Sequence, residues 1–352
     1  MAMRIAVGQA ARATDEYLAF ARQIGAGGVQ FNTPDLPGER RWETADLIGL
    51  RARVESYGLR LEAIENMPNS FYARAMLGQP GRDEELENVI ATVTNMGRAG
   101  IAVLGFHWMP ASVWRTSLAP DGRGGAVVSA FDQAAAHDPD QVYVARRDRR
   151  VEDAKDSWTR GALFELGVER DDADMWAAFE YFVRAVAPAA EEAGVCLAVH
   201  PDDPPVPELG GVARIFRDVD ALKRAADFWP GPGFGIELCL GTVSEMGGQQ
   251  AVLDAVDYLA PRGKIAYVHL RDVRGTVPSF AECFLGEGNY HPPTVLRALR
   301  RGGFDGFILD DHTPALVGDS PYGHRGRAFA LGYIQGLIEM MELDDRELEG
   351  AR

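Results

Sequence analysis

The sequence predicts an α/β fold, a single (β/α)8 TIM barrel with an insertion after its fourth strand, and three observations lead to this prediction. Eight short apolar runs alternate with helical segments, several of which end at glycine. No Gly-x-Gly-x-x-Gly motif follows the first run, which counts against a doubly wound open sheet, the second candidate. The last four runs end in polar side chains, as strands do where a parallel α/β protein presents its chemistry.

The first half of the chain predicts four strands and three helices. An Asp-Glu pair begins the first helix, and Gly25, Gly58 and Gly100 follow the three helices at positions where a left-handed residue ends a helix. We expect strands over 4–9, 28–31, 59–64 and 101–106, and helices over 14–24, 43–57 and 82–99.

Residues 121–170 interrupt this rhythm. They contain a glycine-rich turn at 121–125 and a charged run at 146–156, and they show no clear core period. Long loops of this kind are usually functional or mobile, so we expect either a cap over the site or an exposed excursion. The prediction is one barrel domain over 1–343, with 121–170 as its insertion, and a charged tail over 344–352.

The second half returns to the alternation of strands and helices. A long amphipathic helix is expected over 174–193, and a last helix that closes the barrel over 326–342. The expected strands between them cover 196–199, 234–239, 265–269 and 306–309.

Composition excludes several classes of function. With 52 acidic and 36 basic residues the chain carries a net charge of −16, which argues against binding to nucleic acid or to an anionic membrane. Three cysteines are too few for a disulfide framework, and no signal-peptide pattern or long apolar stretch is evident. We therefore expect a cytoplasmic protein that binds a small molecule, and self-association is left open.

Four strand ends carry residues that bind metal ions. His200, Cys239 and His269 end three successive strands, and the fourth is followed by Asp310-Asp311-His312. These groups lie roughly 30 to 42 residues apart, about the length of one β-α unit, so parallel neighbouring strands would bring them to one mouth. Imidazole, thiolate and carboxylate together favour Mn, Fe(II), Co or Zn over Mg or Ca.

Rival interpretations exist for these residues. Cys239 could be a nucleophile, but its surroundings do not match a nucleophile elbow, and an inert core thiol ranks behind a metal ligand. Only one of Asp310 and Asp311 can point into the mouth, because neighbouring residues in a strand alternate in direction. Glu237 and Asp272 lie close enough in sequence to hold the ligands in place.

Other polar residues follow the strands and could line a substrate pocket. His107, Trp114 and Arg115 come after the fourth strand, and Asn66 comes after the third. Tyr322 lies on the loop after the eighth strand, where its phenol could reach a bound substrate or anchor the loop.

With these motifs assembled, most of the chain resembles the mannonate dehydratase family, a group of metal-dependent barrel enzymes within the xylose-isomerase-like proteins. The resemblance strengthens from the fourth strand onward. The motifs that carry it are His200-Pro201-Asp202-Asp203-Pro204-Pro205, Cys239, Val268-His269-Leu-Arg271-Asp-Val273, Asp311-His312, Met109-Pro110, Trp114-Arg115-Thr116, Phe280-Ala-Glu282, Tyr322 and Gly326-Arg327.

The resemblance implies an activity and a set of residue roles. The family dehydrates D-mannonate to 2-keto-3-deoxygluconate, so the implied substrate is a sugar acid and the implied enzyme class is a hydro-lyase. By the same resemblance, Mn²⁺ or Fe²⁺ is the expected cofactor, although other divalent metals remain open. The implied ligands are His200, Cys239, His269 and Asp311, and the implied acid–base pair is His312 and Tyr322.

The substrate-pocket motifs depart from the family pattern. Leu309 stands where the family has an arginine, and Leu285 stands where a histidine follows Glu282 at the third position. A histidine expected after the third strand is replaced near Ser70-Phe71, and the first strand lacks the family's tryptophan. The predicted ligand set is kept, whereas the wall that would hold the sugar acid is altered.

Elimination of water from a hydroxy acid requires a bound carboxylate, a base for the α-proton and an acid for the departing hydroxyl. Arg271 or Arg115 could pair with the carboxylate, and Asp272 is counted with the substrate-binding residues. The same residues could catalyse a sugar isomerisation or epimerisation, which is the alternative function. A barrel that binds sugars without catalysis is the third hypothesis.

Overall fold

Residues 3–138, 141–145, 158–160 and 167–350 are described in a computed structural model of the chain. Among them, eight parallel strands close into a barrel in the order β1-β17-β14-β13-β10-β4-β3-β2, which confirms the predicted fold class. The barrel strands are β1 (Arg4–Ala10), β2 (Gly28–Asn32), β3 (Arg60–Glu65), β4 (Val103–His107), β10 (Cys196–His200), β13 (Phe234–Cys239), β14 (Ile265–His269) and β17 (Phe307–Leu309).

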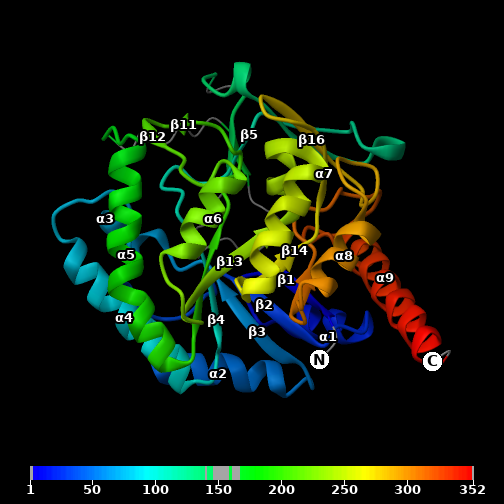
Figure 1. The fold of residues 1–352 in the computed structure, drawn as a ribbon, viewed down its shortest axis with the longest axis horizontal. Helices are drawn as coiled ribbons and strands as arrows, with labels where there is room; N and C mark the ends of the chain where they lie inside the picture. Colours follow the sequence, from blue (N-terminus) through cyan, green and yellow to red (C-terminus); the bar gives the residue numbers. More distant parts are fainter. Residues whose placement is uncertain (1–2, 139–140, 146–157, 161–166, 351–352) are drawn as a thin grey trace.

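Helices surround the barrel, with α4 and α5 on one side in Figure 1 and α7, α8 and α9 on the other. Their ends follow local sequence signals: the side chains of Thr14, Asp171 and Asp218 cap helix N-termini, and Gly194 ends a helix in the left-handed conformation. The helices are α1 (Asp15–Gln23), α2 (Thr44–Glu55), α3 (Ala73–Met76), α4 (Arg82–Arg98), α5 (Asp172–Ala193), α6 (Val219–Asp227), α7 (Leu240–Leu259), α8 (Pro292–Arg301) and α9 (His324–Gly350). Short 3₁₀ turns are η1 (Asn69–Phe71), η2 (Arg123–Gly125), η3 (Gln133–Ala135) and η4 (Ala260–Arg262).

Several predicted boundaries differ from the observed ones. The third strand was expected to end at residue 64, but β3 extends to Glu65 and so includes a carboxylate. The last helix was expected to end at residue 342, but α9 continues to Gly350, so the predicted tail is helical as far as that residue. Within the described part of the chain, no helix is long and apolar enough to cross a membrane.

Small antiparallel sheets lie beyond the carboxyl ends of the barrel strands. They are built from β5 (Trp114–Arg115), β6 (Ser117–Ala119), β7 (Val128–Asp132), β8 (Tyr143–Ala145), β9 (Trp158–Arg160), β11 (Glu208–Leu209), β12 (Val212–Ala213), β15 (Asp272–Thr276) and β16 (Ser279–Cys283). Figure 1 shows β5, β11, β12 and β16 gathered at one end of the barrel. We call this group of sheets the cap.

The cap joins the predicted insertion to a distant segment. β7 pairs with β16, so Phe131 lies opposite Phe280, and both are buried in a cluster that also contains Trp114 and Val273. The sequence shows no clear core period in residues 121–170, but β7 within this range does contribute a buried residue to an apolar cluster. The charged run at 146–156 lies outside the described residues.

Alternate residues of the barrel strands point into the barrel, and the inward side chains form layers. Ala6, Ala63, Ala198, Tyr267, Phe307 and Leu309 make an apolar cluster. Two residues after Ala63, Ala198 and Tyr267 come Glu65, His200 and His269, and two-residue steps return a strand to the same face. Near the mouth the interior layer is therefore polar rather than apolar.

Gly105 of β4 lies level with Glu65 of β3 and leaves room for this polar layer. A Cβ atom at Gly105 would overlap the Tyr267 hydroxyl and come within 2.6 Å of Glu237 Oε2. These groups are buried, so neither can move out of the way without disturbing its neighbours.

The Gly105→Ala substitution is expected to lower the free energy of unfolding by about 1–3 kcal/mol, the usual cost of overpacking a core. The control is Gly332→Ala on α9, where no atom lies within 4 Å of the added carbon. That variant should keep or slightly raise stability, because alanine is the better helix former. Chemical denaturation of both variants measures the difference, and equal stabilities would contradict the packing argument.

Candidate metal centre and surrounding site

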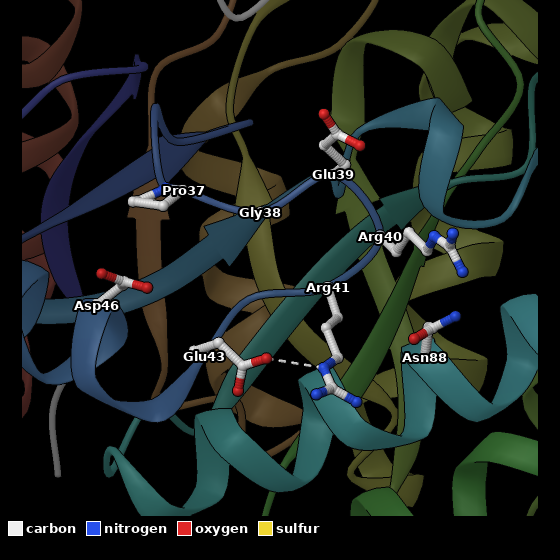
Figure 2. A pocket seen from close by; sticks show the side chains of 8 residues that line it. All are labelled: Pro37, Gly38, Glu39, Arg40, Arg41, Glu43, Asp46 and Asn88. Carbon is white, nitrogen blue, oxygen red and sulfur yellow. Dashed lines mark hydrogen bonds and ion pairs between the residues drawn. The ribbon is translucent and has the colours of Figure 1, made fainter.

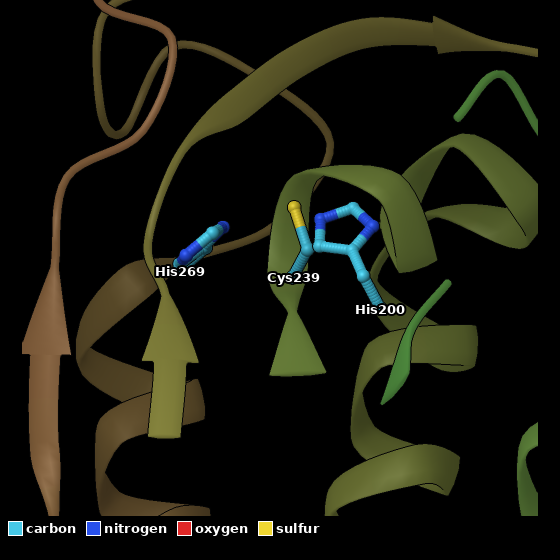
Figure 3. A group of neighbouring side chains, drawn as sticks. All are labelled: His200, Cys239 and His269. Atoms are coloured by element: carbon cyan, nitrogen blue, oxygen red, sulfur yellow. The ribbon is translucent and has the colours of Figure 1, made fainter. Parts of the chain in front are cut away.

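Three of the predicted ligands meet at the ends of adjacent strands. His200, Cys239 and His269 end β10, β13 and β14, and one donor atom from each lies within 4.8 Å of the others. Figure 3 shows the three side chains together above the strand ends. All three are buried, and Cys239 lies beside His269 in the strand register. Parallel pairing therefore brings the predicted groups to one mouth.

Asp311 completes the group, and its neighbour Asp310 does not. Asp311 Oδ2 lies 4.0 Å from Cys239 Sγ and 3.7 Å from His269 Nδ1. Asp310 instead accepts a hydrogen bond of 2.6 Å from Arg327 Nη1. Of these two neighbouring carboxylates, that of Asp311 points into the mouth and that of Asp310 points toward Arg327, as the expected alternation requires.

The surrounding charges keep the anionic members of the group ionised. Burial raises the pKa of the Cys239 thiol, but the Arg271 charge and the adjacent imidazoles of His200 and His269 hold it well below its usual value. Burial likewise opposes ionisation of Asp311, but the charges of His312, His269 and Arg271 keep its pKa well below normal. A thiolate and a carboxylate therefore face the same point.

The donor set fits a divalent transition-metal ion. His269 Nδ1 is buried, has no hydrogen-bond partner and lies on the side of the ring near Asp311. Two imidazoles, a thiolate and a carboxylate are ligands that Mn, Fe(II), Co and Zn accept. The predicted convergence is therefore present; the role of each residue as a ligand stays a prediction.

Two buried arginines form a charged network beside this group. Arg271 Nε lies 3.0 Å from Asp311 Oδ2, and its terminal nitrogens donate to Asp203 at 2.7 Å and to Glu245 at 2.9 Å. Arg115 donates twice to Asp203, at 2.6 and 2.9 Å. Arg271 thus contacts the candidate ligand Asp311 directly. Arg115 is linked to Arg271 through Asp203, which accepts hydrogen bonds from both arginines.

His312 joins this network at the edge of the mouth. Its Nδ1 lies 2.5 Å from Glu282 Oε1, and its Nε2 lies 3.7 Å from Asp311 Oδ1. Burial raises the pKa of Glu282, but the charges of His312 and Arg115 overcome this and lower it to about 2. An ionised carboxylate therefore orients the His312 ring beside the candidate ligand Asp311.

The contacts of Tyr322 lie away from the candidate metal ligands and His312. Its hydroxyl donates to the Gly8 carbonyl oxygen at 2.6 Å, and its ring packs against Tyr17 and Phe20. This is the loop-anchor arrangement that the sequence left open. A catalytic role for Tyr322 stays a prediction that the observed contacts do not support.

Two further predicted substrate residues, Trp114 and Asp272, make structural contacts, and their substrate-binding roles stay predictions. Trp114 is buried in the apolar cluster of the cap, and its indole N–H donates to the Ala111 carbonyl. Asp272 accepts four backbone N–H bonds of 3.0–3.1 Å, one from its neighbour Val273 and three from the loop that follows β16. Neither side chain has a contact with the four candidate ligands among these interactions.

His107 and Asn66 do lie at the mouth. The His107 ring lies 4.6 Å from that of His200, and its Nε2 lies 3.4 Å from Asn66 Nδ2. Asn66 is buried with its Oδ1 unpaired and has a positive φ of 61°. Left-handed backbone at an asparagine is tolerated but uncommon, and it often marks functional sites.

Sequence reasoning missed much of the carboxylate-rich surroundings. Glu65, Asp203 and Glu245 were given no role, although each is buried at the site. Glu237 was named only as a neighbour of the ligands, with its direction unknown. Its position two residues before Cys239 was a usable signal, because residues two apart in a strand share a face.

A separate hollow lies on the outside of the barrel. It has a volume of about 500 Å³ and is bordered by the loop before α2 and by the start of α4. Figure 2 shows its charged side chains, of which Arg41 pairs with Glu43 at 2.8 Å. The lining residues are Pro37, Gly38, Glu39, Arg40, Arg41, Glu43, Asp46 and Asn88. Because Arg40 pairs with the exposed Glu84 and Arg41 pairs with Glu43, we assign this hollow no function.

Comparisons with known proteins relate this chain to one enzyme family. A profile of the D-mannonate dehydratase (UxuA) family matches residues 1–347. The mannonate dehydratase of Streptococcus equi subsp. zooepidemicus is 30% identical over 327 residues, which cover 90% of this chain and 88% of that protein. The mannonate dehydratase of Geobacillus thermodenitrificans is 28% identical, over 94% of this chain and 92% of that protein.

Solved structures give the same relationship. The crystal structure of mannonate dehydratase from Streptococcus suis serotype 2 superposes with a TM-score of 0.81 and 27% identity, covering 97% of this chain and 95% of that one. An L-ribulose 3-epimerase superposes with a TM-score of 0.60 and 16% identity, covering 100% of this chain and 99% of that one. At that identity the epimerase shares the fold alone.

The buried pair of Asp310 and Arg327 gives a prediction about stability. Arg327→Met removes the partner of a fully buried carboxylate, so the free energy of unfolding should fall by about 3–5 kcal/mol. Arg297→Met is the control, since Arg297 and its partner Asp344 are about half exposed (55% and 50%). Exposed pairs contribute at most about 1 kcal/mol, so the control should unfold like the unmodified chain. Similar losses in the free energy of unfolding for both variants would contradict the conclusion that Arg327 compensates the buried charge of Asp310.

Proposed function

The chain belongs to the D-mannonate dehydratase family, and from that premise we propose that it is a metal-dependent hydro-lyase that removes water from a sugar acid such as D-mannonate. The observation that carries the proposal is the meeting of His200, Cys239, His269 and Asp311 beside the pair of His312 and Glu282. The product would be the 2-keto-3-deoxy acid, formed when the enol left by elimination takes up a proton.

The proposed cofactor is Mn²⁺ or Fe²⁺, held by the two imidazoles, the thiolate and the carboxylate of this set. A divalent ion at this position supplies polarisation of substrate oxygens and stabilises the negative charge that develops beside the carboxylate. The unpaired Nδ1 of His269 supports this assignment, since a buried imidazole nitrogen without a partner is otherwise costly.

His312 is the proposed proton-transfer group. The reaction takes a proton from the carbon next to the carboxylate and releases hydroxide from the following carbon, which an acid must protonate. Glu282, 2.5 Å from His312 Nδ1, leaves Nε2 as the nitrogen that can exchange a proton with substrate. Tyr322 is retained as its predicted partner, although its phenol must first leave the Gly8 carbonyl.

Arg271 is the better candidate for binding the substrate carboxylate. Its guanidinium contacts Asp311, a candidate ligand, so a carboxylate that approached the same donor set would lie within its reach. Carboxylates engage the terminal nitrogens of both arginines, but those that Arg115 contacts, Asp203 and Glu282, are not candidate ligands. In this arrangement Arg115 fixes Asp203 and Glu282 rather than the substrate.

The isomerase or epimerase alternative has no specific observation in its favour, since its solved relatives share only the fold. Product analysis separates the two functions. Elimination removes water and yields an α-keto acid, whereas an isomerised or epimerised product has the same molecular formula as its substrate. We expect purified protein supplied with Mn²⁺ to convert at least one C5 or C6 sugar acid to an α-keto acid detected with semicarbazide. Chelator should abolish the reaction and Mn²⁺ should restore it; an isomerised sugar as the sole product would refute the proposal.

The role proposed for His312 is tested by His312→Asn. Loss of a group that transfers protons should lower kcat by at least about a hundredfold, while bound metal measured by elemental analysis stays unchanged. His291→Asn is the control, because His291 is exposed at the start of α8 and bonds only to neighbouring groups outside the mouth. Full activity of His312→Asn would show that this residue has no such role.

A further inference from the structure

The two histidines of the candidate metal centre present different nitrogens to it. His200 Nδ1 lies 2.5 Å from the Pro201 carbonyl oxygen, which can only accept a hydrogen bond, so this nitrogen carries a proton. His269 has the opposite arrangement: its Nε2 lies 3.1 Å from Glu65 Oε2, and its Nδ1 is the unpaired nitrogen. A backbone carbonyl orients one ring and a carboxylate orients the other.

Glu65 is itself held firmly from the neighbouring strands. Gln30 Nε2 donates to its Oε2 at 2.5 Å, and Asn32 Nδ2 donates to its Oε1 at 3.0 Å. Gln9 Nε2 lies 3.3 and 3.4 Å from the two oxygens, and Gln9 adopts a positive φ of 68°. Non-glycine residues rarely adopt that conformation, and such strain persists where surrounding contacts enforce it. These amide donors fix the position of a carboxylate that has no contact with Asp311 or Cys239 of its own.

Glu237 places a second carboxyl group at the same nitrogen. Its Oε1 lies 3.1 Å from His269 Nε2, although only Glu65 has hydrogen-bond geometry toward that atom. Glu237 precedes the candidate ligand Cys239 by two residues on β13, so the two side chains lie on the same inner face. Both carboxylates therefore lie on the side of the ring away from Nδ1.

We propose that Glu65, supported by Glu237, is a positioning residue for the metal: it accepts the Nε2 proton of His269 and so directs Nδ1 toward the ion. A carboxylate behind a metal-binding imidazole fixes the ring's tautomer and orientation and makes the ring a stronger donor. Glu65 acts through His269 and does not touch the substrate. The inference rests on the proposed metal centre and adds a residue from β3, a strand that provides none of the four ligands.

The test is the affinity of metal-free protein for Mn²⁺, measured by electron paramagnetic resonance without substrate. Glu65→Gln should bind Mn²⁺ about 10- to 100-fold more weakly than the unmodified chain, the usual effect of losing such a partner. Glu62→Gln is the matched control, because Glu62 lies on the same strand but pairs with Arg4 and Arg60. That variant should bind Mn²⁺ like the unmodified chain.

A second pair of variants shows whether Glu65 acts through the ring. In the background of His269→Ala, the change Glu65→Gln should alter Mn²⁺ affinity by less than about twofold, because the imidazole that couples the two is gone. A loss of the same size with and without His269 would overturn the inference. So would equal affinities of Glu65→Gln and the unmodified chain.

Nuclear magnetic resonance of the unmodified chain, labelled at histidine nitrogens and loaded with Zn²⁺, decides the matter without a variant that might not fold. The inference expects a proton on Nε2 of His269 and the metal on Nδ1, and the reverse assignment would overturn it. Failure of the unmodified chain to bind metal would overturn the proposed function as well. Tight binding unaffected by Glu65→Gln would overturn this inference alone.

Discussion

Two anionic side chains, Cys239 and Asp311, lie 4.0 Å apart in a mouth from which water is largely excluded, and the rest of the site follows from this constraint. Buried charges of like sign are costly unless opposite charges and hydrogen bonds surround them. Arg271 supplies one positive charge at 3.0 Å from Asp311, and the two histidines contact the thiolate. Arg271 needs further anions in turn, and Asp203 and Glu245 provide them. The charged network around the mouth is thus a consequence of the anions at its centre.

The barrel makes this arrangement possible because parallel strands end at one edge. His200 lies level with His107, and Cys239 lies level with His269, in the registers of their strand pairs. A one-residue shift in any of these strands would turn a donor out of the barrel. Asp310 and Asp311 show the same effect within two residues, since the first faces Arg327 and the second faces the mouth. Strand register, rather than the chemistry of the side chains alone, decides which groups meet.

These relations explain what the sequence could and could not predict. Strand ends are visible as apolar runs that stop at a polar residue, so the barrel and the four converging groups were predictable. The contacts of Asp272 were not predictable because its partners are backbone N–H groups of a loop that folds back beside it, and a sequence does not reveal backbone donors. β7 was missed because its partner β16 lies far along the chain, as in the pairing of Phe131 with Phe280. Tyr322 matched a motif, but a motif does not specify where a hydroxyl points.

The polar interior of the barrel is the feature least expected from general rules, since such interiors are usually filled by apolar side chains. Here Tyr267 stacks on Phe307 at 4.9 Å, and one layer nearer the mouth Glu65 and Glu237 flank His269. Burial and the charge of Glu65 raise the pKa of Glu237 to about 8, so keeping both carboxylates there lowers stability. A fold optimised only for packing would place apolar side chains in this layer. The two carboxyl groups behind the His269 imidazole are therefore best explained by a functional need to orient that ring toward the candidate metal centre.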